Sequence, residues 1–384
     1  MRTKVFTTVF ICGVFTCISC VEEYNLDIDK YDNILVVDGM ITDDPSPYTV
    51  NLSLSSTLKN RDYIPYPNAE VIIIDDLGNS ETLTEINPGE YSTAIDGMQS
   101  VIGRKYKVEI TTPDEKIYFS EFEELLAPVE LDSIYSEIES RESFFHYYDL
   151  LGLQFFLDTK TAIKDTNYFL WRLESTFEYN SSYRISHIFN GTLEPCTNRD
   201  TLYTCWKTDI VGEIFTSNTI NLSQAKILRY PLIYVSTEER DLSVMYSLLV
   251  KQYTISEEVY NFWHSIDDLN SDQGALHSSL PYQIRGNILC EQNIDEPVLG
   301  YFMVAGLSEK RIFVERPRLT FHYWTCYLTI VDFENMNYLA WAPPNVWPLY
   351  VTTSVNGGMA LPHQDCIDCT RKGGVAFKPE YWIE

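Results

Sequence analysis

Two kinds of hydrophobic pattern divide the chain. At the N-terminus, an apolar run from Val5 to Ile18 follows the basic residues Arg2 and Lys4. This length and polarity are typical of the core of a signal peptide, and the run is too short to remain as a membrane span. The pattern predicts that residues 1–19 form a signal peptide that is removed on export.

From residue 34 onward, short apolar or alternating runs predict β-strands separated by turns. The clearest early runs are Ile34–Met40, Thr49–Leu54, Val71–Ile74 and Tyr106–Ile110. Turn signals such as Asn87-Pro88-Gly89 lie between them. Short strands at this spacing predict a β-sandwich over residues 34–128.

The later part of the chain has longer strand-like runs rich in aromatic residues, at Leu151–Leu157, Tyr168–Leu173 and Tyr230–Val235. They predict a second, larger β-rich domain over residues 129–384, so that the fold class is mainly β. One helix is expected near 255–270, where Thr254 and Glu257 have the spacing of a capping box. Apolar residues then recur on one helical face, and Trp263 among them is predicted to be core.

The end of the signal peptide carries a second signal. Ile18-Ser19-Cys20 has the small residue and the cysteine that a lipoprotein signal peptidase requires, which predicts cleavage before Cys20 and lipidation of its thiol. Several acyl chains on one residue give stable anchoring without a span. The alternative is an ordinary signal peptide with an incidental cysteine. Residues 20–33 are polar and acidic and are predicted to be a tether.

Charge narrows the classes of partner. The net charge is −27, from 55 acidic and 28 basic residues. Such a chain repels phosphate backbones and anionic lipid surfaces, so we expect no nucleic acid partner and no electrostatic docking on membranes. The acids are spread along the chain, which is typical of a solubilising surface.

Six cysteines follow Cys20, and in an exported protein an even number predicts disulfides. They are Cys196, Cys205, Cys290, Cys326, Cys366 and Cys369. Cys196 and Cys205 are close enough in sequence to close one loop, while Cys366 and Cys369 could pair with each other or with Cys290 and Cys326. A zinc site that adds His363 to the last pair is the alternative.

Enzyme signatures are missing from the sequence. It has no Gly-x-Ser-x-Gly elbow, no zinc-protease helix and no glycine-rich phosphate loop. The acidic pairs Asp75-Asp76 and Asp267-Asp268 resemble glycosidase carboxylates only in composition. Trp341, Trp347 and Trp382 could be exposed and stack on a sugar or peptide ligand. They could equally be buried in an aromatic core. We therefore predict no catalytic residue, no metal and no cofactor, and we assign no ligand site.

An ordered set of short stretches resembles a family of Bacteroidota outer-membrane lipoproteins known as domain of unknown function 4249. The stretches are Leu35-Val36-Val37-Asp38-Gly39-Met40-Ile41-Thr42-Asp43, Pro67-Asn68-Ala69-Glu70-Val71, Asn87-Pro88-Gly89-Glu90-Tyr91, Val101-Ile102-Gly103-Arg104-Lys105-Tyr106, Gly286-Asn287-Ile288, Glu296-Pro297-Val298-Leu299-Gly300-Tyr301-Phe302, Lys310-Arg311-Ile312-Phe313 and the tail around Cys366-Ile367-Asp368-Cys369. The resemblance implies an immunoglobulin-like N-terminal sandwich and a TonB-dependent outer-membrane receptor as partner.

The residues after Cys20 bear on location. In Bacteroidota lipoproteins, an acidic pair such as Glu22 and Glu23 resembles the signal for export to the cell surface. We expect a surface-exposed outer-membrane lipoprotein that assists a transporter, with the periplasmic face as the alternative location. A free-standing adhesin or scaffold is the alternative function, and a surface hydrolase is a third.

Overall fold

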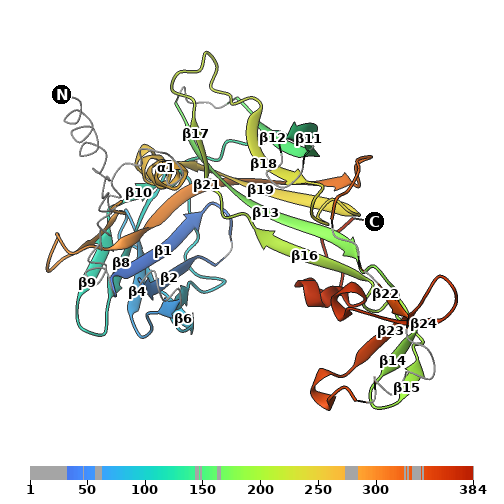
Figure 1. Cartoon of the computed structure of the whole chain (residues 1–384). Coiled ribbons are helices and arrows are strands. Elements are labelled where there is room, and N and C mark those ends of the chain that lie inside the picture. The colour runs from blue at the N-terminus through green and yellow to red at the C-terminus, as the bar shows by residue number, and fades with distance from the viewer. Residues whose placement is uncertain are drawn as a thin grey trace, which may run out of the picture.

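The computed structural model describes residues 33–383, except 46, 57–62, 143–146, 148, 162–165, 273–283, 324–325, 327, 331–338 and 340. These residues form a mainly β structure with sandwich-like packing, as predicted from the sequence. Figure 1 shows a long twisted sheet that runs through the body, with a small lobe at one end.

The long sheet has ten strands in the order β16-β13-β19-β21-β1-β2-β7-β6, with β17 paired to β13 and β3 to β2. Its strands are β1 (Leu35–Thr42), β2 (Thr49–Leu54), β3 (Ile64–Pro65), β6 (Thr84–Asn87), β7 (Glu90–Ser92), β13 (Tyr168–Asn180), β16 (Thr204–Ile210), β17 (Phe215–Asn218), β19 (Met245–Ile255) and β21 (Leu299–Glu315).

A second sheet packs on the β1–β2 end of the long sheet and completes the N-terminal sandwich. It contains β4 (Glu70–Asp75), β5 (Ser80–Thr82), β8 (Lys105–Thr111), β9 (Ile117–Ser120), β10 (Glu123–Glu124) and β20 (Ile288–Cys290). Alternate residues of β1 and β4, such as Val37 and Ile73, are fully buried between the sheets. These two strands were predicted from continuous apolar runs, and successive side chains of a strand point to opposite faces of its sheet.

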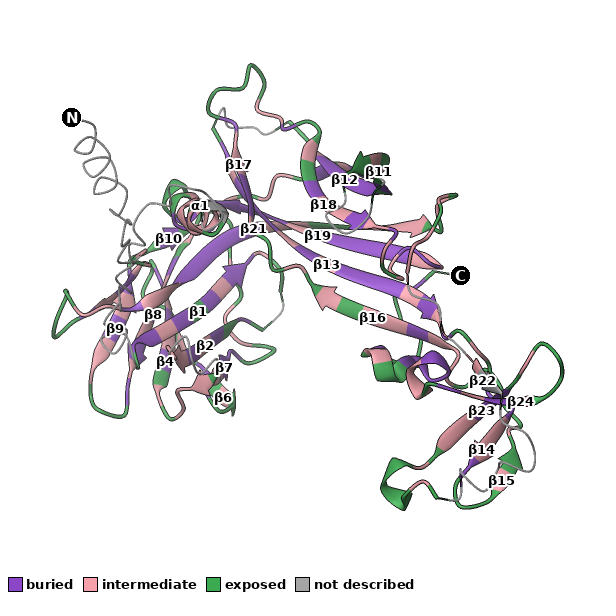
Figure 2. Ribbon diagram, in the orientation of Figure 1, coloured by how far each residue is buried: buried purple, intermediate pink, exposed green. Residues whose placement is uncertain are grey.

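A third sheet covers the β13–β19 end of the long sheet. It contains β11 (Leu131–Arg141), β12 (Leu150–Thr159) and β18 (Tyr230–Ser236). Phe155 and Leu157 of β12 pack with Trp171 of β13 and Leu248 of β19 to form a second core. Figure 2 shows the buried residues following the long sheet through both sandwiches.

β21 joins the two sandwiches because it runs through both. It pairs in parallel with β1 and antiparallel with β19. Its early residues Phe302 and Val304 belong to the first core, whereas Ile312 and Val314 pack against the second. The boundary near Pro128 stays a prediction, but the N-terminal sandwich also takes β20 and β21 from the later sequence.

The helix α1 (Glu257–Asp272) packs on the other face of the long sheet, near its middle. Its Val259, Phe262 and Trp263 contact β21 and β13 side chains, so Trp263 is part of a packed cluster, as predicted. The predicted capping box is wrong. Ser256 accepts the hydrogen bond from the Val259 N–H, while the Thr254 hydroxyl accepts one from Val129. None of the helices that the structure describes combines the length and apolar character needed for a membrane span.

The lobe is a separate small sheet in the order β15-β14-β23-β24-β22. Its strands are β14 (His187–Phe189), β15 (Leu193–Pro195), β22 (Leu328–Ile330), β23 (Leu349–Thr353) and β24 (Met359–Pro362). Short 3-10 helices, Pro344–Val346, Gln364–Cys366 and Cys369–Lys372, complete the C-terminal part. The lobe buries few apolar side chains, with Phe189, Leu339 and Val351 at its centre.

Candidate functional site

A cavity of about 1280 Å³ opens where the N-terminal sandwich, α1 and the start of the second sandwich meet. We call it the junction groove. Glu123 of β10 and Tyr301 of β21 lie in its wall beside the first two turns of α1. Apolar side chains also line it, including Phe122 beside β10, Phe262 of α1 and Leu289 of β20. The size and the mixture of apolar walls with a few polar groups are typical of a ligand site.

Glu123 is the most unusual polar residue of the groove. Only 9% of its surface is exposed. One carboxylate oxygen accepts a hydrogen bond of 2.6 Å from the Tyr301 hydroxyl, and the other accepts one of 3.3 Å from the Val304 N–H. Burial raises the pKa of Glu123 to about 7, and these two hydrogen bonds offset the shift only in part. The groove therefore holds a carboxyl group that titrates near neutral pH.

The charges around Glu123 are mainly negative. Glu257 and Glu258 lie exposed in the first turn of α1, and Glu258 also contributes to the raised pKa of Glu123. Lys160 forms an ion pair with Glu130 at the edge of the groove, so these two charges balance. The groove has an excess of carboxylates over cations.

Sequence analysis did not identify Glu123 or Tyr301. Both residues face inward from strands, but they come from distant parts of the chain, so their pairing has no local signal. The available hint was the position of Glu123 two residues before the apolar Leu125, since both residues are buried while Glu124 between them is exposed. A carboxylate at an inward strand position is expensive to bury unless it has partners or a function.

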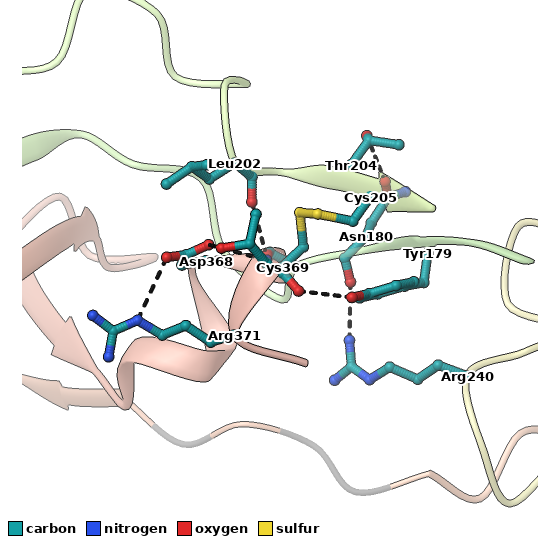
Figure 3. Close-up of a disulfide and its surroundings, with 11 residues drawn as sticks. Tyr179, Asn180, Leu202, Thr204, Cys205, Arg240, Asp368, Cys369 and Arg371 are labelled. Atoms are coloured by element: carbon teal, nitrogen blue, oxygen red, sulfur yellow. Dashed lines mark hydrogen bonds and ion pairs between the residues drawn. A yellow bond between two sulfur atoms is a disulfide. The ribbon is translucent and has the colours of Figure 1, made fainter. Parts of the chain in front are cut away.

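Four of the six candidate cysteines form two disulfides. Cys205 of β16 is bonded to Cys369, and Cys326 is bonded to Cys366. Figure 3 shows the first, in which Cys369 also accepts a 2.7 Å hydrogen bond from the Tyr179 hydroxyl and donates its N–H to Leu202. Cys205 and Cys369 are both fully buried in the second core. The C-terminal tail is therefore fastened to the body beside β13 and β16.

Two of the expected cysteine pairings are wrong. Cys196 and Cys290 are free thiols, so the loop closed by Cys196 and Cys205 does not form. Cys205 pairs instead with Cys369, because the fold brings β16 against the tail. Cys366 and Cys369 are not bonded to each other, whereas the alternative of a bond from this pair to Cys326 is present at Cys366.

The zinc interpretation of the tail is also wrong. The sulfurs of Cys366 and Cys369 are each bonded to another cysteine, so neither can act as a thiolate ligand. His363 lies 3.3 Å from a carboxylate oxygen of Asp365 and is exposed. Within the described part of the chain, no group of three His, Cys, Asp or Glu side chains has metal-binding geometry.

A family model described as "Domain of unknown function (DUF4249)" matches residues 21–311. The chain belongs to this family. The DUF4249 match includes both residues of the Glu123–Tyr301 pair and all of α1, and it ends inside β21. Three lobe strands and the disulfide-bonded tail lie beyond it. No curated protein matches the chain.

The acidic pair Asp75-Asp76, inside the DUF4249 match, is structural. Arg104 contacts Asp75 at 2.7 Å and Asp76 at 2.5 Å, and Asp75 also accepts hydrogen bonds from Leu77 and Asn79 in the turn after β4. Asp268 of the second pair lies 3.9 Å from His264 on the surface of α1.

The three tryptophans of the C-terminal part have different environments. Trp382 packs edge-on against Phe313 and donates a hydrogen bond to Glu178, so it belongs to the core. Trp347 packs edge-on against Phe189 inside the lobe. Trp341 is 86% exposed and remains available for contacts.

Several predicted residues lie outside the described residues. They are Cys20, Glu22 and Glu23, the signal peptide 1–19 and the rest of the predicted tether up to residue 32. Their assignments stay predictions.

Proposed function

We propose that this DUF4249 protein is a non-enzymatic, lipid-anchored outer-membrane protein that helps a TonB-dependent transporter to capture or admit a ligand. The observation that carries the proposal is Ile18-Ser19-Cys20 at the end of an apolar signal run. Family membership supports it, because the resemblance to this family implies such a partner.

The length of the predicted tether limits how far the N-terminal sandwich can lie from the membrane. Fourteen residues lie between Cys20 and β1, and a fully extended chain of this length reaches at most about 50 Å. β1 belongs to the N-terminal sandwich, whereas the lobe lies at the other end of the long sheet. A lipid on Cys20 would therefore keep the sandwich near the membrane and leave the lobe farther away.

A free-standing adhesin or scaffold is the second candidate. The observation that favours it is the shared sheet, which connects the sandwich to the far end of the body without a linker. Such a sheet suits a spacer that holds the exposed Trp341 of the lobe away from the membrane.

Co-purification separates the two candidates. We expect the tagged wild-type protein, extracted from outer membranes in mild detergent, to retain a stoichiometric TonB-dependent barrel that mass spectrometry identifies. Cys20→Ala is the matched control, because it removes the anchor and should leave the protein outside the membrane fraction. Recovery of the wild-type protein without a barrel would overturn the transporter proposal and favour the scaffold.

A further inference from the structure

We propose that the junction groove binds an organic cation with an apolar body, such as an aliphatic or aromatic amine, whose positive charge pairs with Glu123. This inference deepens the proposed function, because it names the chemical class of ligand that the protein would capture. It rests on a cavity, on the charges that line it and on the hydrogen bonding of one buried carboxylate.

The first argument is the balance of charge in the groove. Once the ion pair between Glu130 and Lys160 is set aside, five carboxylates and two cations remain in the lining. The carboxylates are Glu121, Glu123, Glu124, Glu257 and Glu258, and the cations are Lys105 and Arg285. An excess of one sign in a cleft with low-dielectric walls attracts ligands of the opposite sign.

The start of α1 does not reverse this preference. A helix N-terminus carries partial positive charge and by itself favours anions. Here the first turn carries the carboxylates Glu257 and Glu258, and the Ser256 hydroxyl oxygen accepts a hydrogen bond from the Val259 N–H. These groups offset the positive end of the helix within the chain itself.

The second argument is the environment of Glu123. Its donors, the Tyr301 hydroxyl and the Val304 N–H, are neutral, and it forms no ion pair within the described ranges. Glu258 of α1 helps to raise the pKa of Glu123, and Glu121 beside β10 helps to raise the pKa of its partner Tyr301, so both of these charges of the groove are acidic. A buried carboxylate without a cationic partner gains most when a ligand supplies the charge.

The third argument is the shape and chemistry of the walls. Phe122, which is 44% exposed, contributes an apolar surface to the groove together with Phe262 and Leu289. These side chains would cover a hydrocarbon or aromatic body, and a small inorganic ion would leave them in contact with water. The arrangement therefore fits an amine better than a metal ion.

A fluorescence titration with monodansylcadaverine tests the inference, because this probe joins an aromatic body to a primary amine. We expect saturable binding to the full-length wild-type protein at pH 7.5. The matched probe, in which a carboxylate replaces the amine, should bind at least about 30-fold more weakly. Glu123→Gln should weaken binding of the amine by a similar factor, as expected when one partner of a buried charge pair is neutralised.

Glu213→Gln is the control for net charge, because Glu213 is exposed and lies outside the groove. It should leave the affinity within about twofold of the wild type, as surface charge changes usually do. Equal binding of both probes, or an unchanged affinity in Glu123→Gln, would overturn the inference.

The pH profile gives a second readout that does not depend on the Glu123 variant folding. Affinity for the amine should fall as pH drops below about 7, because Glu123 then becomes neutral. Tyr301→Phe removes a donor that stabilises the carboxylate, so the midpoint of the profile should move to higher pH. A flat profile, or an unshifted midpoint in this variant, would contradict the inference. Co-purification of a barrel by a protein that fails these tests would leave the transporter proposal standing.

Discussion

Gly300 lies at the start of β21, where the parallel pairing with β1 begins. Its φ is +86°, and a Cβ at this position would lie 1.9 Å from the carbonyl oxygen of Val37. Gly103 has almost the same φ, +84°, but a Cβ there would meet nothing within 4 Å. Comparing alanine substitutions at the two positions therefore distinguishes the cost of backbone strain from the cost of steric contact with the neighbouring strand.

Gly300→Ala should lower the free energy of unfolding by about 3 kcal/mol or more, because strain and the contact with Val37 add together. Gly103→Ala should lower it by about 1 to 2 kcal/mol, the cost of the left-handed conformation alone. Urea denaturation of both variants measures the difference. Equal losses would mean that β1 and β21 do not approach as closely as described.

Glu123 should make stability depend on pH. Its pKa is about 7 in the folded protein, above the ordinary value of 4.5 that applies when the chain is unfolded. Between these values the folded state keeps a proton that the unfolded state has lost, so stability falls as pH rises. Relative to Glu123→Gln, the wild type should lose about 3 kcal/mol between pH 4 and pH 8. Parallel pH dependences in urea denaturation would contradict this.

Single residues were predictable from the sequence only where local chemistry decided their role. The even number of cysteines after Cys20 predicted disulfides, but Cys205 and Cys369 are separated by 164 positions, and no local spacing indicates that pairing. Glu123 was missed for the same reason, because its partner Tyr301 belongs to a distant strand.

At the scale of elements, the disulfide between Cys205 and Cys369 fastens the tail to β16. Replacing both cysteines with alanine should lower the free energy of unfolding by about 2 to 5 kcal/mol, since the unfolded chain is no longer cross-linked across a long loop. Cys196→Ala is the matched control, because Cys196 is a free thiol, and it should change stability by less than about 0.5 kcal/mol. A double variant as stable as the control would show that the bond does not constrain the chain.

The main strands of the N-terminal sandwich were well predicted because each carries its own apolar or alternating run. β2 (Thr49–Leu54) coincides with its predicted run, and the run Tyr106–Ile110 lies within β8. The helix α1 was also predicted to within two residues at each end. Its cap was not, because the Thr254 hydroxyl is taken by Val129, a contact that local spacing cannot reveal.

At the scale of the whole molecule, the sheet order could not be predicted. The order of the strand-like runs along the sequence predicts a sandwich followed by a second β-rich domain. The structure contains two sandwiches. Their connection depends on β21, which pairs with β1 from the beginning of the chain and with β19 immediately before α1. The two sandwiches therefore share a sheet, so substitutions in β21 such as Gly300→Ala should affect both.

We propose that this protein is held at the cell surface beside a transporter. Cross-linking on intact cells with a membrane-impermeant, lysine-reactive reagent tests it most directly, because it requires surface exposure and proximity together. We expect cross-links, identified by mass spectrometry, between this chain and one TonB-dependent barrel. A chain that reacts only after the cells are lysed, or that cross-links to no barrel on intact cells, would contradict it.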